Sequence, residues 1–340
     1  MTGPRKGARY HGDQALIPGV LDFAVNVRAA APPPWLRDRL ASRLDELGSY
    51  PRRDDEQRAV DAVAERHGRA PDEVLLLAGA AEGFAMLPRL NPRRAAVVAP
   101  GFTEPEAVLT DAGIPLEHVV LPPPFTLGDT ARVPDEADLV VVGNPTNPTG
   151  VLHTREQLLA LCRPGRILVV DEAFIDAVPG EPESVASLSL PGLVVLRSLT
   201  KTWALAGLRA GYAVGDPEVL RRLARGRAHW PLGTLQLEAL AACNTAQAVA
   251  SAVLDAQRLV EMRHRQADGL RGLGLAVTEG VAPFLLVAVP HADLMRKHLK
   301  VKNIAVRRCD TFVGLDGGDY LRVAVRPEWP ELVQAMKEIL

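Results

Sequence analysis

Polar side chains that could carry out chemistry stand directly after several short apolar runs of this chain. Amide, carboxylate, hydroxyl and amine groups occur at these places, on Asn147, Asp171, Ser198, Thr200 and Lys201. A lysine amine can act as a nucleophile and as an acid or base, and a positioned carboxylate can hold a cation. We therefore expect these residues to form one active site, provided that the fold brings the runs together.

The apolar runs have the features of buried parallel strands. Each is followed by a turn or polar residue, and most are followed by a helical pattern; the runs cover 74–77, 95–98, 139–142, 167–170 and 193–196. Continuous apolar runs that alternate with helices are typical of a parallel sheet covered on both faces. In such a sheet, ligands bind beyond the carboxyl ends of the strands. The polar residues named above follow the strands at that edge.

Groups that could bind anions form a second set of candidates. The backbone N–H groups of Ala80 and Ala81 open an expected helix, and a helix N-terminus attracts anions. Near the C-terminus, strand alternation places Arg322 and Arg326 on one face, and Arg307 is a further candidate. Separated arginines predict a substrate that carries a phosphate besides its carboxylate.

The composition argues against several classes of protein. A formal net charge of −2 gives no reason to expect a nucleic-acid or anionic-membrane partner. The three cysteines lie far apart without metal-binding spacing, so we expect no metal, no disulfide framework and a cytoplasmic location. No apolar stretch reaches the ~20 residues of a membrane helix, and no signal peptide is expected. The glycine-rich motifs of nucleotide-binding proteins do not occur.

The pattern of the chain changes near residue 235. A long helical pattern runs from there to about residue 270, and three further strand-like runs follow at 284–289, 304–306 and 320–325. We therefore predict an α/β protein whose large domain, 31–235, holds a mostly parallel sheet sandwiched by helices. A smaller α+β domain at 236–340 follows it. Residues 1–30 are expected to form an arm on the substrate side, as part of the small domain or of dimer contacts.

Four motifs follow one another within the predicted large domain: NPTNPTG at 144–150, DEAF at 171–174, SLTK at 198–201 and GLRAGY at 207–212. Their order and spacing resemble those of the fold type I pyridoxal-phosphate enzymes, specifically the class I/II aminotransferase family. The resemblance spans nearly the whole chain. It implies the fold type I architecture and pyridoxal 5′-phosphate as the cofactor.

The resemblance also implies roles around that cofactor. Lys201 is expected to bond the cofactor aldehyde and then to move protons on the substrate. Asp171 is expected to pair with the pyridine nitrogen, and Asn147 to hydrogen-bond the ring's phenolic oxygen. Contacts to the phosphate and to the ring face are expected from Ala80, Ala81, Phe102, Ser198, Thr200 and Arg209.

Partners and substrate follow from the same resemblance. Tyr50 matches a tyrosine that family members send into the neighbouring subunit's phosphate site, which implies a homodimer with shared active sites. Arg322 matches the arginine for the substrate's α-carboxylate. The substrate is expected to be a small phosphorylated amino acid or amine, with further groups placed around it: His11, Asn26, Arg28, Arg307 and Arg326.

Two branches of the family fit the chain. The preferred interpretation is a threonine-phosphate decarboxylase of cobalamin biosynthesis. The chain resembles these enzymes in its DEAF and SLTK motifs, in His11-Gly12 and in the segments at 306–315 and 320–326. The alternative is an aminotransferase of the histidinol-phosphate type, whose members usually have a tyrosine in place of Phe174. A non-catalytic pyridoxal-phosphate-binding protein is a third interpretation, which the intact lysine, aspartate and phosphate-binding residues disfavour.

Some positions depart from the usual pattern of one branch or the other. Asp13 stands where a second glycine is usual after Gly12, and Arg28 stands where a small polar residue is usual. Phe174 lacks the hydroxyl that would hydrogen-bond the cofactor's phenolic oxygen, so we expect a changed pH profile. These departures bear on the substrate and leave the expected cofactor residues intact.

Overall fold

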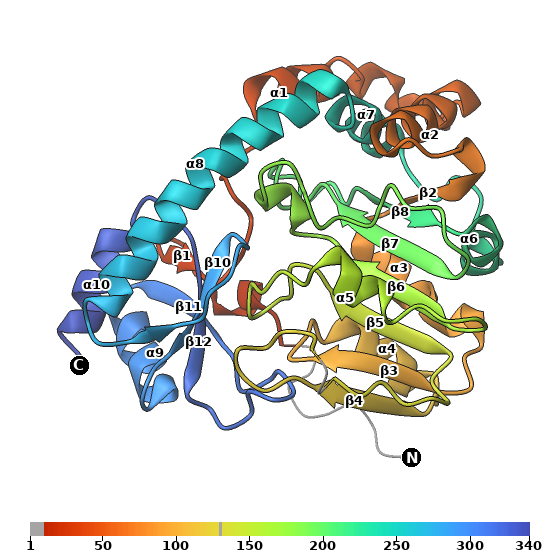
Figure 1. The fold of residues 1–340 in the computed structure, drawn as a ribbon. Coiled ribbons are helices and arrows are strands. Elements are labelled where there is room, and N and C mark those ends of the chain that lie inside the picture. Colours follow the sequence, from red (N-terminus) through yellow and green to blue (C-terminus); the bar gives the residue numbers. More distant parts are fainter. Residues whose placement is uncertain (1–9, 129–130) are drawn as a thin grey trace.

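The computed structural model describes residues 10–128 and 131–340, which form two β-sheets connected by a long helix (Figure 1). The larger sheet has seven strands in the order β2-β8-β7-β6-β5-β3-β4. Its central strands are parallel, and only β8 runs antiparallel to its two neighbours. The smaller sheet has five strands in the order β1-β11-β12-β10-β9 and is mostly antiparallel. The predicted α/β class is confirmed.

The strands of the larger sheet include all five predicted apolar runs. These are β2 (Val74–Leu77), β3 (Ala95–Ala99), β5 (Leu139–Gly143), β6 (Ile167–Asp171) and β7 (Leu193–Ser198). Two strands of this sheet escaped prediction, β4 (Leu116–Val120) and β8 (Gly211–Gly215). Strand β4 is an exposed-edge strand with polar residues, and β8 is bounded by glycines, so neither has the continuous apolar pattern of a central strand.

Successive residues of the central strands are buried on opposite faces of the sheet. Val141 and Val169 contact the core under α3 (Ala80–Met86), α4 (Glu104–Asp111) and α6 (Pro217–Ala224). Val140 and Val170 belong to the core on the other face, which includes Leu158 of α5 (Arg155–Leu159). Because both faces are covered, the strand positions before the carboxyl ends are apolar, which explains the uninterrupted runs.

The predicted single helix after residue 235 is wrong at one point. The structure has two helices, α7 (Thr234–Cys243) and α8 (Ala246–Arg271), with a bend of 72° between them. Asn244 leaves the helical path and its side-chain amide donates to the Leu240 carbonyl, while the Thr245 hydroxyl accepts the N–H of Ala248 and caps α8. Local side-chain capping therefore outweighs the continuous helical pattern here.

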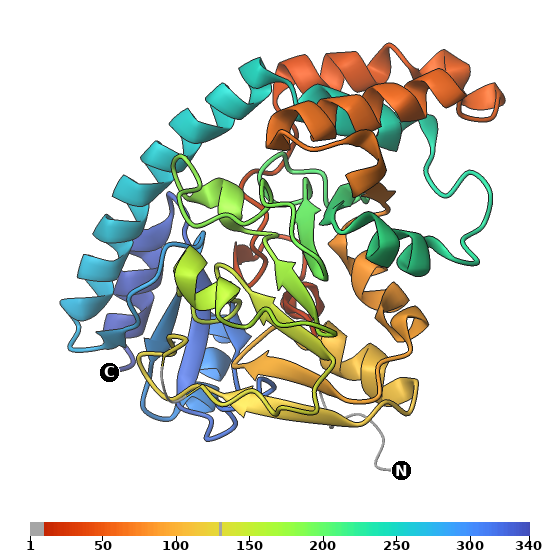
Figure 2. The same cartoon turned by 45° about the vertical axis from the view of Figure 1, so that its right-hand side comes forward.

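Helix α8 connects the helices beside the larger sheet to the smaller sheet (Figure 2). At its first end lie α1 (Pro34–Ala41), α2 (Arg53–His67) and α7. At its other end the smaller sheet packs against α8, α9 (Ala292–Val301) and α10 (Trp329–Lys337) through a shared apolar core. The strands of this sheet are β1 (Leu21–Phe23), β9 (Ala276–Val277), β10 (Phe284–Ala288), β11 (Ile304–Arg308) and β12 (Tyr320–Ala324).

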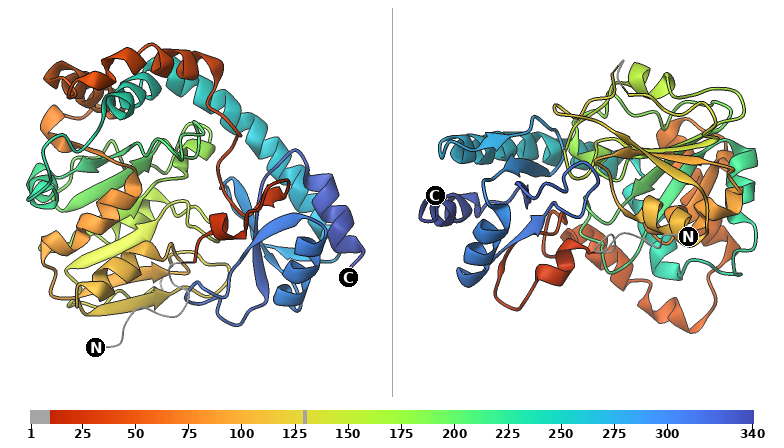
Figure 3. Two further views of the ribbon diagram at one scale, coloured as in Figure 1. Left: turned by 180° about the vertical axis from the view of Figure 1, so that it is seen from behind. Right: turned by 90° about the horizontal axis from the view of Figure 1, so that it is seen from below.

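The N-terminal segment, which comprises the described residues 10–33 before α1, passes between the two sheets (Figure 3). Its strand β1 pairs in parallel with β11, so a segment from the beginning of the chain completes the C-terminal sheet. The first nine residues of the expected arm lie outside the described residues. The domain boundaries at 30/31 and 235/236 and the cytoplasmic location stay predictions.

Over the described ranges 10–128 and 131–340, no single helix is both long and apolar enough to cross a membrane. Helices α7 and α8 meet those criteria of length and composition only as a bent pair.

A buried cluster of charges supports the edge of the larger sheet where the polar residues lie. Arg197 of β7 is 1% exposed and donates to Glu172 at 3.1 Å, to Asp176 at 2.6 Å and to Glu181 at 2.8 Å. Glu172 also accepts bonds from the Ser184 hydroxyl and the Val185 N–H. Arg197 directly precedes Ser198 and Glu172 directly follows Asp171, so the cluster connects the ends of β6 and β7.

We expect the substitution Arg197→Met to lower the free energy of unfolding by about 3–5 kcal/mol, because it leaves the buried Glu172 without its cation and leaves Asp176 and Glu181 paired with Arg66 alone among the described residues. Urea denaturation followed by circular dichroism measures this loss. Arg93→Met is the matched control, because the Arg93 side chain is 86% exposed in its pair with Asp138 and should contribute about 0–1 kcal/mol. Equal losses in the two variants would contradict a stabilising role for the buried cluster.

Candidate functional site

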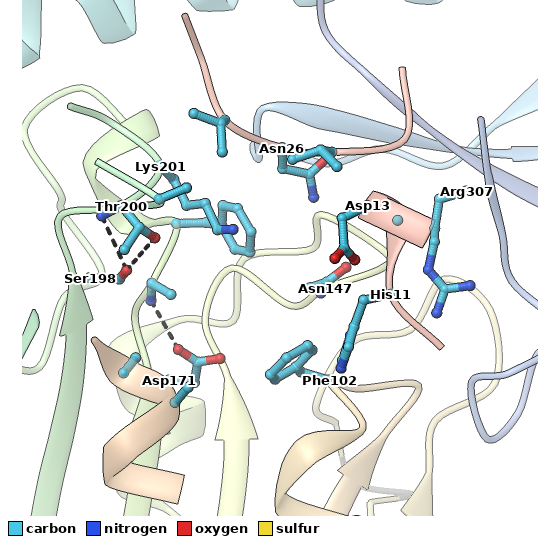
Figure 4. A pocket seen from close by; sticks show the side chains of 18 of the residues that line it. His11, Asp13, Asn26, Phe102, Asn147, Asp171, Ser198, Thr200, Lys201 and Arg307 are labelled. Carbon is cyan, nitrogen blue, oxygen red and sulfur yellow. Dashed lines mark hydrogen bonds between the residues drawn. The ribbon is translucent and has the colours of Figure 1, made fainter. Parts of the chain in front are cut away.

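A cavity of about 440 Å³ lies where the carboxyl ends of the large sheet's strands face the N-terminal segment and the smaller sheet. It brings together most of the predicted residues, several of which Figure 4 shows around one space. The predicted residues that line the cavity are His11, Asn26, Ala80, Ala81, Phe102, Asn147, Asp171, Ser198, Thr200, Lys201, Arg209, Arg307 and Arg322. Three predicted residues do not line it: Tyr50, Arg28 and Arg326.

Two glycines allow the backbone to come close at one end of the cavity. Gly79 has φ of +82°, and a Cβ there would lie 2.8 Å from Nη2 of Arg209. A Cβ on Gly211 would lie 2.6 Å from the Arg197 carbonyl oxygen and 3.0 Å from the Ala80 nitrogen. The absence of both side chains therefore lets the Arg209 guanidinium and the start of α3 share this corner.

Hydroxyl groups complete the same corner. The hydroxyls of Ser198 and Thr200 lie 2.8 Å apart, and the Thr200 N–H donates to the Ser198 hydroxyl at 3.3 Å. Both residues are buried, at 5% and 3% exposed. With the Arg209 guanidinium and the first N–H groups of α3, they form a set of donors suited to a phosphate, which we call the anion corner (Ala80, Ala81, Ser198, Thr200 and Arg209).

Lys201 lines the cavity in an environment that disfavours its protonated form. The pKa of the amine is lowered to about 8, mainly by burial and also by the nearby Arg322 and Arg209 cations, whereas Asp171 and Asp13 act in the opposite direction. A lysine whose pKa falls toward neutrality has a larger fraction of nucleophilic amine at physiological pH.

Asp171 ends strand β6 at the floor of the cavity and is only 9% exposed. Burial raises the pKa of its carboxyl to about 6, while the N–H of Ala173, donated at 3.1 Å, favours the ionised form. Phe174 lines the cavity too, with its ring at 85° to that of Phe284. A carboxyl in this state can hold a protonated ring nitrogen of a ligand.

Two buried arginines face the cavity from the smaller sheet. Arg307 of β11 and Arg322 of β12 are directly opposite in the antiparallel ladder. Arg322 donates to the Asn147 side-chain oxygen and the Ala24 carbonyl, both at 2.6 Å, and its Nε has no partner in the part of the chain that the structure describes. Arg307 donates to the Tyr10 carbonyl at 2.7 Å and to the Thr311 hydroxyl at 2.8 Å. Neither has a carboxylate within ion-pair distance among residues 10–128 and 131–340, so both can bind an anion.

The prediction that Arg326 lies in the substrate site is not supported by its position. Its guanidinium donates to the carbonyl oxygens of Asp22 at 3.1 Å, Val25 at 2.8 Å and Val27. These three bonds tie β12 to the N-terminal segment, so Arg326 holds that segment against the cavity. The alternation holds for Arg322 in β12, but this strand ends at Ala324, so Arg326 lies beyond it. The sequence also could not show that the chain's own carbonyl groups bind the Arg326 guanidinium.

Arg28, which was expected beside the substrate, also lies outside the cavity. Burial lowers the pKa of its guanidinium, and the carboxylates that oppose this effect are Asp255 of α8 and Asp176 of the buried cluster. Its backbone, however, bears on the site, because the Arg28 N–H donates to the Lys201 carbonyl at 3.1 Å.

Tyr50 is on the surface of the chain. Its side chain is 72% exposed and stacks on Trp230 at a ring-centroid distance of 4.2 Å. Trp230 is itself 58% exposed. The role of Tyr50 in a neighbouring subunit stays a prediction.

The N-terminal segment also brings His11 and Asp13 to the mouth of the cavity (Figure 4). The His11 ring lies 5.7 Å from that of Phe102, and its Nε2 is 3.9 Å from the Glu104 carboxylate. Burial lowers the pKa of His11, as do Arg307 and Lys201, while Glu104 and Asp13 act in the opposite direction.

Sequence reasoning missed several lining residues. Phe84 and Thr103 were not singled out, Phe312 was noted only as part of the segment at 306–315, and Asp13 was noted only as a departure. The bond between Asn147 and Arg322 was also missed, because these residues are 175 positions apart. No local signal reveals such contacts, which depend on how the two sheets meet.

Comparison with known proteins identifies the family. The family model "Aminotransferase class I and II" matches residues 18–336. A histidinol-phosphate aminotransferase of Mycobacterium tuberculosis is 65% identical over 337 residues, covering 99% of this chain and 92% of the relative. A threonine-phosphate decarboxylase of Salmonella typhimurium is 32% identical over 338 residues, covering 94% and 91%.

The fold is shared with solved structures. A histidinol-phosphate aminotransferase from Sinorhizobium meliloti in complex with pyridoxal-5′-phosphate superposes with a TM-score of 0.81 at 20% identity, covering 93% of this chain and 89% of that one. This likeness confirms the expected fold type I architecture, and the match to the family confirms the expected cofactor. This chain is a pyridoxal-phosphate-dependent enzyme that belongs to the class I and II aminotransferase family.

Proposed function

We propose that this enzyme transfers the amino group of a phosphorylated amine, of the histidinol-phosphate type, to a 2-oxo acid such as 2-oxoglutarate. Support comes from the 65% identity to a protein named as a histidinol-phosphate aminotransferase, against 32% to one named as a threonine-phosphate decarboxylase. The proposal therefore takes the alternative interpretation of the sequence in preference to the decarboxylase.

One observation carries the proposal at the level of the site. A buried lysine, a buried carboxyl, the anion corner and two arginines without carboxylate partners among the described residues line a single cavity. Two buried polar atoms of residues that line the cavity, Oδ1 of Asn26 and Nε of Arg322, have no partner within residues 10–128 and 131–340. Unsatisfied buried atoms of this kind are costly unless a ligand pairs with them.

The residues present fit pyridoxal phosphate. The anion corner would hold its phosphate, Asp171 its ring nitrogen and Asn147 its phenolic oxygen, while Phe102 would contact the ring. When bound, the cofactor supplies a ring that stabilises negative charge on the carbon next to the amine.

Lys201 is proposed as the catalytic residue. Its Nζ would hold the cofactor covalently, and as a free amine it would serve as the acid–base group at the substrate carbon. A pKa near 8 suits this work, because an acid–base group is most effective when its pKa lies close to the working pH. The buried carboxyl of Asp171 would pair with the ring nitrogen and favour its protonated form.

Arg322 and Arg307 are proposed to bind the anionic groups of the substrate. Arg322 lies beside Asn147 and is placed for a carboxylate, such as that of the amino-acid partner of the reaction. Arg307, opposite it in the ladder, is placed for a phosphate. His11, Asn26 and Asp13 border the same space and would contact the rest of the substrate.

We also propose that the active enzyme is a homodimer. Tyr50 and Trp230 form a stacked and largely exposed aromatic pair, and water-exposed aromatic surface of this kind is a usual component of subunit contacts. In such a dimer, Tyr50 would reach the anion corner of the partner subunit.

The low pKa of Lys201 predicts how its reactivity depends on pH. In the cofactor-free protein, labelling of Lys201 by trinitrobenzenesulfonate should reach half its maximal rate near pH 8, because only the unprotonated amine reacts. In Arg322→Met the midpoint should move to higher pH, since removing a nearby cation makes the protonated amine more favourable. Peptide mapping measures both, with the other lysines of the digest as internal reference. An unchanged midpoint would contradict the proposed coupling.

The reaction itself can be tested by product analysis. The purified enzyme with histidinol phosphate and 2-oxoglutarate should form glutamate, and with threonine phosphate it should release little carbon dioxide. Lys201→Ala should lose activity by on the order of 10³-fold or more, because no other group replaces the amine. Carbon dioxide from threonine phosphate without any glutamate formation would instead support the decarboxylase.

The proposed phosphate role of Arg307 predicts a selective defect. Arg307→Met should lower kcat/KM for the phosphorylated substrate by about 10²-fold, because a desolvated anion loses its partner, and should hardly affect the dephosphorylated analogue. Arg308→Met is the matched control, since Arg308 is the next residue of the strand and pairs with Asp310. Equal losses on both substrates would place Arg307 in a purely structural role.

A further inference from the structure

The segment that follows α6 is attached to the anion corner at two points. At one, Nε and Nη2 of Arg227 donate to the two carboxylate oxygens of Glu82 at 2.9 and 2.8 Å. At the other, the Gln236 side-chain amide donates to the Arg209 carbonyl at 2.8 Å and accepts the Gly233 N–H at 2.6 Å. The segment from 227 to 236 therefore contacts the corner on two sides, at Glu82 in the first turn of α3 and at Arg209.

Glu82 has two consequences for this corner. Its carboxylate accepts the Ala78 N–H at 2.6 Å and so fixes the turn that leads into Gly79 and α3. It also places a negative charge in the first turn of α3, immediately after the N–H groups of Ala80 and Ala81. An uncompensated carboxylate at this place would repel the phosphate that the corner is built to receive.

Arg227 provides the compensating charge. Its side chain is 11% exposed and that of Glu82 is 24% exposed, so the pair is largely shielded from water. The bidentate geometry leaves both carboxylate oxygens occupied, one of them also by the Ala78 N–H. Neither Arg227 nor Glu82 lines the cavity, so any effect on a ligand must act through the corner.

We propose that Arg227 is a positioning residue for the cofactor phosphate: it neutralises Glu82, so that the carboxylate can hold the turn before α3 without repelling the phosphate. This inference rests on the proposed assignment of the anion corner to the phosphate. It extends the site to the α6–α7 segment, which no motif of the sequence indicated.

The test compares two ligands that differ only by the phosphate ester, pyridoxal phosphate and pyridoxal. Their affinities for the cofactor-free protein are measured by equilibrium dialysis. Arg227→Met should raise the Kd of pyridoxal phosphate by about tenfold, because the Glu82 charge is then unbalanced. The Kd of pyridoxal should change by less than about twofold. Equal weakening of both ligands, or of neither, would overturn the proposal.

Two rescue variants separate charge from general damage. Arg227→Lys keeps the cation, and the double variant Arg227→Met/Glu82→Gln removes both charges while keeping an acceptor for the Ala78 N–H. Each should bind pyridoxal phosphate within about threefold of the unsubstituted protein, since the net charge beside the corner is restored. A double variant as weak as Arg227→Met would show that charge balance is not the role of Arg227.

A matched ion pair elsewhere in the chain controls for lost stability. Arg69 donates to both oxygens of Glu73 at 3.0 and 2.7 Å, and Glu73 accepts the Ala70 N–H at 2.9 Å, but this pair does not adjoin the cavity. Arg69→Met should destabilise the protein without any selective loss of pyridoxal phosphate over pyridoxal. A selective loss in this control as large as that in Arg227→Met would overturn the proposal.

Arg209→Met tests the assignment on which the inference rests. If this variant loses no more affinity for pyridoxal phosphate than for pyridoxal, the anion corner does not hold the phosphate, and the proposed site is wrong. If Arg209→Met shows the selective loss and Arg227→Met does not, the site assignment stands and only the role of Arg227 is refuted.

Discussion

The site depends on cations that are buried without an equal number of anions. Lys201, Arg209, Arg307 and Arg322 line one cavity, whereas the carboxylates that line it are Asp171 and Asp13. Removing a charge from water is costly, and here the cost shows as a lowered pKa of Lys201 and of Arg322. An anionic ligand relieves this imbalance, so the same arrangement that strains the free protein provides affinity and orientation for phosphorylated and carboxylated molecules.

The fold tolerates these cations because neutral oxygens hold them in place. Arg322 and Arg307 donate to backbone carbonyls, an amide and a hydroxyl, which fix the guanidinium planes and leave their charge available. Arg197, which directly precedes the cavity residue Ser198, has charged partners instead of neutral ones, because it pairs with three carboxylates. Full pairing makes Arg197 a structural residue, while partial pairing makes Arg307 and Arg322 receptive to a ligand. The type of partner, rather than burial, distinguishes the two roles.

The N-terminal segment joins the two sheets into one site. Strand β1 completes the smaller sheet, Arg326 binds the carbonyls of this segment, and the Arg28 N–H donates to the Lys201 carbonyl. His11, Asp13 and Asn26 are thereby brought opposite the large sheet. A chemical distinction between substrates can arise here, because this segment carries Asp13, which lines the cavity and stands where the decarboxylase branch is expected to have a glycine.

The sequence alone determined the central strands and the polar residues at their ends, because burial on both faces leaves a continuous apolar pattern that no other element of this chain shares. It also indicated the candidate cofactor residues that line the cavity, because they follow the ends of β2, β3, β5, β6 and β7 in the sequence. The tertiary structure alone decided which arginines serve the site: Arg307 and Arg322 face the cavity, while Arg326 is occupied by the chain's own carbonyls. It also divided the long helix at Asn244 and revealed the pair of Arg227 with Glu82, 145 positions apart. Contacts between side chains that are far apart in sequence depend on how helices and strands pack together, and local sequence patterns do not predict that packing.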